Sequence, residues 1–204
     1  MSGRKVQVVG CGGHGKVVIR ALQCLGDTVV RIYDDDSTKW GTALLDIPIL
    51  GPTERIHEFE SLPTIIAVGD NQARKRLAEK LNADWLTVVH PEAFVDSTVV
   101  LGRGVVVLPG AVIQVDSQIG NHVIVNSSAS IDHDCVIQDY VHVAPGVNLA
   151  GRVNVDEGAF LGAGCTVIPG ISIGAWAKIG SGAAVIRHIH AFAVAVGVPA
   201  KPIS

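Results

Sequence analysis

Apolar residues follow two different patterns along this chain, and the change comes near residue 90. In the first part, short apolar runs at Val6–Val9, Thr28–Tyr33 and Thr64–Val68 predict buried strands. Between and after them, Lys16–Leu25 and Asn71–Leu81 carry apolar residues at helical spacing. This alternation of strand and helix predicts a small parallel sheet. We therefore expect residues 1–90 to form an α/β domain.

In the second part, an aliphatic residue recurs at every sixth position from Val95 to Val185, and all sixteen positions are Val, Ile or Leu. Two places before each of them the residue is again small or aliphatic, as at Ala111 and Cys135. Each hexad therefore predicts one short strand and one corner, and three hexads predict one triangular coil. We expect residues 91–204 to form an all-β parallel β-helix of a little over five coils.

Composition limits the classes of protein that this chain can represent. Its longest apolar runs fall far short of the ~20 residues that a bilayer requires. A net charge of -3, without an extended basic cluster, argues against nucleic acid or an anionic membrane as a partner. The four cysteines are scattered singly, which fits a reducing compartment and excludes a thiolate zinc site. We expect a cytoplasmic protein without a metal.

Charge is unevenly distributed between the two parts. Residues 94–204 carry only 5 Lys or Arg and 7 Asp or Glu, although this part is the longer one. Faces rich in Val and Ala would leave large apolar patches on a monomer. Because most soluble oligomers are closed and symmetric, we expect these faces to pack in a homotrimer.

A glycine-rich loop follows the first predicted strand. Gly10, Gly12 and Gly15 match the pattern G-x-G-x-x-G, with Gly13 and His14 inside it. Such a loop lets backbone N–H groups at a helix N-terminus approach a phosphate. The same glycines would also permit a tight turn between strand and helix, but His14 has little packing purpose in such a turn. The loop therefore favours a phosphate-bearing ligand.

Three aspartates close the second predicted strand, about twenty residues after the loop. Asp34 and Asp35 are placed to accept from a ribose hydroxyl, although a solvated strand end is an equally good interpretation. A dinucleotide needs two mononucleotide-binding halves, and about 90 residues provide only one. We therefore expect a nucleotide that carries something shorter than a second nucleoside, and not NAD.

A polar segment interrupts the apolar coil. Asn126 opens it, His133 lies between Asp132 and Asp134, and His142 follows. A histidine beside a carboxylate is a suitable general base near neutral pH. His142 comes nine residues after His133, half a coil away, so we do not expect the two to share a face of one subunit. Across a trimer interface they could converge.

Several of these motifs occur together in one known family. They are Gly-x-Gly-Gly-His-Gly-Lys, Val68-Gly69-Asp70-Asn71, Asn126-Ser127-Ser128, Asp132-His133-Asp134-Cys135 and the closing Gly197-Val198-Pro199-Ala200-Lys201. Together they resemble the hexapeptide-repeat sugar O-/N-acetyltransferases of the sialic acid and bacillosamine type. The resemblance implies that the β-helix is left-handed and trimeric and that acetyl-CoA binds between subunits. It also implies a Rossmann-like half domain that holds the nucleotide of a UDP-linked amino sugar.

The resemblance also implies roles for individual residues. His133 would be the catalytic base and Asp134 its carboxylate partner, although Asp132 is an alternative to Asp134. The implied substrate-binding residues are Gly12, Gly13, His14, Asp34, Asp35, Asp70, Asn71 and Asn126. The implied acetyl-CoA-binding residues are His142 near the thioester, the Gly151 amide as oxyanion donor and Lys201 at a CoA phosphate.

The predicted function is acetyl transfer from acetyl-CoA to the amine of a UDP-linked amino sugar, with a 4-amino sugar favoured, in bacterial surface-glycan biosynthesis. One alternative is O-acetylation of a sialic acid. A second is a zinc carbonic anhydrase on the same coil, for which His122, His133 and His142 could be proposed as ligands. A third is a non-catalytic protein that binds a nucleotide sugar.

Overall fold

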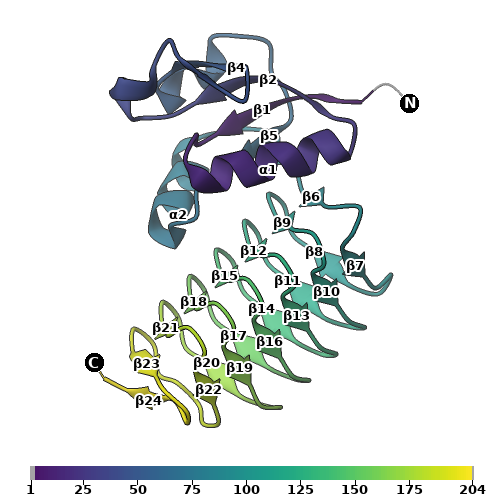
Figure 1. Ribbon diagram of the computed structural model, residues 1–204, viewed down its shortest axis with the longest axis vertical. Coiled ribbons are helices and arrows are strands. Elements are labelled where there is room, and N and C mark those ends of the chain that lie inside the picture. Colours follow the sequence, from purple (N-terminus) through teal and green to yellow (C-terminus); the bar gives the residue numbers. More distant parts are fainter. Residues whose placement is uncertain (1–2, 204) are drawn as a thin grey trace.

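The computed structural model describes residues 3–203, which form two stacked parts (Figure 1). The first part is an α/β domain, with one helix packed on each face of the sheet. Its elements are β1 (Lys5–Val9), α1 (Gly13–Cys24), β2 (Thr28–Tyr33), η1 (Ser37–Lys39), β3 (Ala43–Leu44), β4 (Ile47–Gly51), η2 (Thr53–His57), β5 (Thr64–Ile66) and α2 (Asn71–Lys80). The sheet order is β3-β4-β2-β1-β5, and only β3 runs antiparallel to its neighbour. The predicted half domain is confirmed, with β3 and β4 added.

The second part is a stack of short strands, each two or three residues long. It begins with β6 (Val88–Val89), which pairs with β9 one coil later, so the coil starts just before residue 90. The sixteen strands β7–β22 follow at intervals of six residues, and every one ends on a residue of the aliphatic series.

Their bounds are β7 (Phe94–Val95), β8 (Val100–Leu101), β9 (Val106–Val107), β10 (Val112–Ile113), β11 (Gln118–Ile119), β12 (Ile124–Val125), β13 (Ser130–Ile131), β14 (Val136–Ile137), β15 (His142–Val143), β16 (Asn148–Leu149), β17 (Asn154–Val155), β18 (Phe160–Leu161), β19 (Thr166–Val167), β20 (Ser172–Ile173), β21 (Lys178–Ile179) and β22 (Ala184–Val185). The chain closes with β23 (Val194–Val196) and β24 (Lys201–Pro202).

These strands form the three sides of a triangular helix. One side is β22-β19-β16-β13-β10-β7, the second is β20-β17-β14-β11-β8, and the third runs from β6 through β9, β12, β15, β18 and β21 to β23 and β24. We call the third side the docking sheet. The aliphatic series and the small residues two places earlier fill the interior, where Val107, Ala111, Ile131 and Cys135 are fully buried. The predicted left-handed β-helix is confirmed by the solved structures described below.

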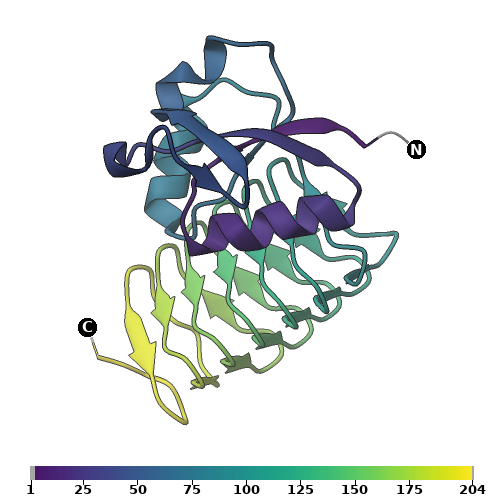
Figure 2. The same cartoon turned by 45° about the horizontal axis from the view of Figure 1, so that its top comes forward.

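The α/β part lies on the docking sheet, with α1 running across several coils (Figure 2). Val106 in β9 and Leu108 directly after it point outward and share one buried cluster with Val8, Leu22 and other residues of the α/β domain. Burying this apolar surface fixes the two parts against each other. Within residues 3–203, no helix is both long enough and apolar enough to cross a membrane.

Candidate active site

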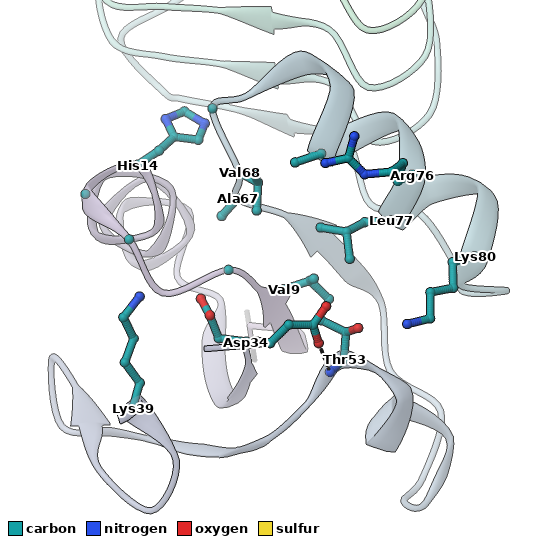
Figure 3. A pocket seen from close by; sticks show the side chains of 16 residues that line it. Val9, His14, Asp34, Lys39, Thr53, Ala67, Val68, Arg76, Leu77 and Lys80 are labelled. Carbon is teal, nitrogen blue, oxygen red and sulfur yellow. Dashed lines mark hydrogen bonds between the residues drawn. The ribbon is translucent and has the colours of Figure 1, made fainter. Parts of the chain in front are cut away.

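A cavity of about 560 Å³ opens in the α/β domain above the carboxyl ends of β1 and β5 (Figure 3). Its floor is the glycine loop and the start of α1, where Gly12 is the N-cap and provides no capping side chain. Lys39, Arg76 and Lys80 add positive charge to the walls. Lys39 and Lys80 form ion pairs with Asp36 and Glu54. The N–H groups at the α1 N-terminus and the Arg76 guanidinium therefore make the strongest case for an anion site.

The positions of the loop require glycine for different physical reasons. Gly10 has φ +105°, and a Cβ there would lie 2.7 Å from Val68 Cγ2. A Cβ on Gly15 would lie 2.7 Å from the Gly10 oxygen, so this glycine lets α1 pack closely on the strand. Gly12 and Gly13 have nothing within 4 Å of an added Cβ, and both line the cavity. Their missing side chains therefore leave room for a ligand.

Asp34 and Asp35 also line the cavity, and both accept hydrogen bonds from backbone amides of neighbouring loops. Asp34 Oδ2 accepts from the Cys11 amide at 2.8 Å, and Asp35 Oδ1 accepts from the Thr53 amide at 2.8 Å. Burial acts to raise the pKa of Asp34, but the hydrogen bonds from Cys11 and Asp36 outweigh it and lower that pKa. The carboxylates keep lone pairs for a ligand, because each oxygen can accept more than one hydrogen bond.

Beside the cavity, the α/β domain meets the docking sheet where His142 contacts Gly69, a residue of the cavity wall. His142 Nδ1 lies 3.2 Å from the Gly69 oxygen and Nε2 lies 3.1 Å from Asn126 Nδ2. The His14 ring, which lines the cavity, lies 6.2 Å from the His142 ring between centroids. Since a carbonyl only accepts, Nδ1 carries the His142 proton, and Nε2 accepts from Asn126. His14, Asn126 and His142 thus form one cluster. The sequence-based prediction assigns His14 and Asn126 to the sugar substrate and His142 to acetyl-CoA.

The histidines of this cluster are neutral at neutral pH. Burial, and after it the charge of Arg74, lowers the pKa of His14 to about 4. The same two causes lower the pKa of His142 to about 4. His14 Nε2 is buried without a hydrogen-bond partner within residues 3–203, an unsatisfied polar atom on a residue that lines the cavity.

His133 occupies a different place, at the corner between β13 and β14. Its Nδ1 lies 2.7 Å from Asp134 Oδ2, so Asp134 is the carboxylate that contacts the ring, while Asp132 accepts from the His133 amide at 2.8 Å. Within the described part of the chain, His133 Nε2 has no hydrogen-bond partner. One coil later Gly151 occupies the same corner, and a Cβ there would lie 2.5 Å from His133 Nε2. Among residues 3–203, no acceptor receives the Gly151 N–H.

Three other residues expected in the site do not line this cavity. Asp70 caps α2, because its carboxylate accepts from the Ala73 amide at 2.7 Å. The Asn71 amide is buried and donates to the Gly158 and Ala159 oxygens of the β-helix. Lys201 is exposed on β24 at the end of the chain. The structure gives Asp70 and Asn71 structural contacts and leaves Lys201 on the surface.

Sequence reasoning missed Lys39, Thr53, Arg76 and Lys80, which line the cavity. The only available signal was the position of Arg76 and Lys80, four residues apart and so on one face of α2. Within residues 3–203 there is no group of three or more His, Cys, Asp or Glu side chains that could hold a metal ion.

Comparisons with known proteins agree with this geometry. Residues 5–81 match the family described as the PglD N-terminal domain. The UDP-N-acetylbacillosamine N-acetyltransferase of Bacillus subtilis is 42% identical over 119 residues, which are 52% of this chain and 51% of that enzyme. The aligned part thus spans about half the length of that curated relative.

Solved structures match over nearly the whole chain. PerB from Caulobacter crescentus, in complex with CoA and GDP-perosamine, has a TM-score of 0.92 and 39% identity and covers 98% of this chain and 97% of its own. The acetyltransferase domain of PglB from Neisseria gonorrhoeae, in complex with acetyl coenzyme A, has a TM-score of 0.92 and 32% identity, with coverage of 98% and 100%.

Proposed function

The chain belongs to the hexapeptide-repeat sugar N-acetyltransferases related to PglD and PerB, and on this premise we propose that it acetylates the amino group of a UDP-linked 4-amino sugar. The acetyl donor is acetyl-CoA, and the product serves bacterial surface-glycan biosynthesis. The enzymes named above act as amino-sugar N-acetyltransferases, which favours this function over sialic acid O-acetylation, a zinc enzyme and a non-catalytic binder. Both substrates are cytoplasmic metabolites, which supports a cytoplasmic location.

One observation carries the proposal: a cavity that suits a nucleotide diphosphate is lined by His14, whose ring lies 6.2 Å from the ring of His142 on the docking sheet. The α1 N-terminus and Arg76 suit the diphosphate, and Asp34 and Asp35 suit the nucleoside. The sugar would then extend toward His14, whose Nε2 has no protein partner within residues 3–203. An amino sugar at this place lies beside polar groups that are neutral and fixed, which favours an uncharged amine.

The His133 corner supplies the chemistry of acetyl transfer. Asp134 holds the proton on Nδ1, so Nε2 accepts a proton from the attacking amine or from the zwitterionic tetrahedral intermediate. The new C–N bond forms at the thioester carbon, and the C–S bond breaks. The imidazolium then returns a proton to the CoA thiolate. The unpaired Gly151 N–H, one coil away, is positioned to stabilise the oxyanion.

These two halves of the site lie on opposite parts of one chain. His142 belongs to the docking sheet, whereas His133 lies at the corner between the other two sides, which is the vertex facing away from that sheet. A cavity and a base from the same chain therefore cannot meet. We propose that a neighbouring copy supplies His133 to each cavity in a homotrimer. Light scattering that gives a stable monomer of 21.3 kDa would overturn this arrangement.

The test of the function is an acetylation assay with free-thiol detection over matched UDP- and GDP-linked amino sugars. We expect turnover with a UDP-linked 4-amino sugar and none with free sialic acid. Positioned bases contribute about 10²–10⁴-fold, so His133→Ala and His133→Gln should both lower kcat by about that factor. Retention of more than about a third of kcat by folded His133→Ala would place the base elsewhere.

The trimeric site has its own test. Mixed trimers of a His133→Ala chain and a chain with a blocked cavity, Gly12→Leu, should recover activity because some sites combine an intact cavity with an intact base. No recovery above the two parent variants would show that the cavity and the base act within one chain.

A further inference from the structure

Arg74 on α2 is almost completely buried, with 1% of its surface exposed. Its Nε donates to the His122 oxygen at 2.8 Å and its Nη2 donates to the Tyr140 oxygen at 2.8 Å. Its Nη1 donates to the Val68 oxygen at 3.0 Å and the Gly69 oxygen at 3.3 Å. Its Nη2 also donates to Asn71 Oδ1 at 2.9 Å. Within residues 3–203 no carboxylate pairs with it, so backbone carbonyls and one side-chain amide oxygen solvate this cation.

The carbonyls on the β-helix side come from one corner of the coil. His122 and Tyr140 are 18 residues apart and occupy the same position in successive coils, both with positive φ, at 53° and 60°. This backbone conformation belongs to the tight corner, and it leaves the carbonyls open to α2. Asn71 extends the contact to the next coil through Gly158. Helix α2 therefore donates hydrogen bonds to the same corner position in three successive coils.

The carbonyls on the other side belong to the site. Val68 and Gly69 line the cavity, and the Gly69 oxygen also accepts from His142 Nδ1. Arg74 is thus bonded at the same time to the cavity wall and to the coil that carries His142. An apolar residue would tether the domains at lower desolvation cost, but only a planar guanidinium can bind four carbonyls in fixed directions.

We propose that Arg74 is a positioning residue for acetyl transfer, which holds the Val68–Gly69 wall at a fixed place above the docking sheet and so sets where the sugar lies relative to His142. This inference rests on the proposed function. The titratable groups that face Arg74 and His142 are Asp70, Tyr140, His14 and His122.

Electrostatics agrees with this role. Burial lowers the pKa of Arg74 to about 10, so the guanidinium stays charged at neutral pH. After burial, its charge is the second cause of the low pKa of His14 and of His142. Removal of the charge should therefore raise the pKa of His142, an effect that a purely mechanical tether would not have.

The experiment compares Arg74→Met and Arg74→Lys with Lys75→Met as the matched control. Lys75 also ties α2 to the coil, through Glu157 and beside the rings of Tyr140 and Trp176, but it touches neither the cavity wall nor His142. Measurements are kcat and KM with the nucleotide sugar, acetyl-CoA binding by calorimetry, the thermal midpoint, and the histidine C–H signals of His142 by NMR as a function of pH.

We expect Arg74→Met to lower kcat by about 10²-fold, the effect of a misplacement near 1 Å, with acetyl-CoA binding unchanged. The His142 titration should move upward by about half a pH unit or more. Arg74→Lys keeps the positive charge but loses the planar set of guanidinium donors. Its kcat should therefore fall by about 10-fold, while the pKa of His142 stays low. Lys75→Met should keep kcat within about 3-fold.

Equal kcat for folded Arg74→Lys and Lys75→Met would overturn the proposal, because the fork would then have no positioning effect. An unchanged His142 titration in Arg74→Met would overturn the electrostatic part. If Arg74→Met does not fold, Arg74→Lys still decides the question. If the wild type acetylates none of the sugars, the proposed function fails, whereas the histidine titration still reports on Arg74.

Discussion

Gly151→Ala tests whether the His133 ring position controls acetyl transfer. In the native structure an added Cβ would lie 2.5 Å from His133 Nε2 and 2.6 Å from Cε1. Ordinary van der Waals contact begins near 3.4 Å, so the ring has to move by about 1 Å. The His133 side chain is 44% exposed in the single chain, so no residue of its own coil prevents it from swinging away from Gly151.

The expected magnitude follows from this displacement. A misplacement of about 1 Å in a catalytic group costs on the order of 10²-fold in rate, which corresponds to about 2.7 kcal/mol in the barrier. Gly151 has no positive φ, so alanine causes no backbone strain there. We expect the free energy of unfolding to change by less than about 1 kcal/mol, because the clash is relieved at the surface.

The assay measures kcat by free-thiol release, with urea unfolding as the stability control. A double-mutant cycle with His133→Ala separates the displaced ring from any direct effect on the oxyanion. If the ring is the cause, Gly151→Ala should cost less than about 3-fold in the His133→Ala background. An equal loss in both backgrounds would refute the reasoning, and so would a wild-type kcat in the single variant.

Three further predictions concern other parts of the site. Asp134→Asn should lower kcat by about 10–10²-fold while Tm stays unchanged, as measured by thiol release and calorimetry. Gly12→Leu should abolish nucleotide-sugar binding in calorimetry and leave acetyl-CoA binding intact, because the new side chain enters the cavity. His14, His122 and His142 have folded pKa values lowered to about 4, below the unfolded 6.5. Their contribution, about 3 kcal/mol each at most, is present above pH 6.5 and is lost as pH falls toward 4, as urea unfolding across that range should show.

The β-helix was predictable because its period is imposed by the core. Each coil has three sides, and every side needs one inward aliphatic residue, so the hexad pattern is dictated residue by residue from Val95 to Val185. The strand β4 was missed because Pro48 and Gly51 weaken its pattern and only Ile47 and Ile49 mark its buried face.

The different surroundings of three consecutive residues on α2 could not be predicted in the same way. Arg74, Lys75 and Arg76 are consecutive and look alike in sequence, yet the first is buried, the second contacts Glu157 and the third lines the cavity. Helical spacing turns successive residues by about 100°, which predicts three directions. What lies in each direction depends on the docked coil, which no local pattern contains.

The exact repeat of the coil connects these observations. Corner residues 18 apart present the same groups in successive coils, so one corner offers α2 a row of carbonyls from His122 and Tyr140, while another brings Gly151 under His133. The 18-residue repeat of the β-helix therefore fixes the distance of the cavity from the docking sheet. It also fixes the position of His133 at the opposite vertex. The β-helix repeat fixes the positions of the cavity and of His133, but within one chain they lie on opposite sides of the helix. In the proposed trimer, symmetry between copies brings the cavity of one chain to the His133 of another.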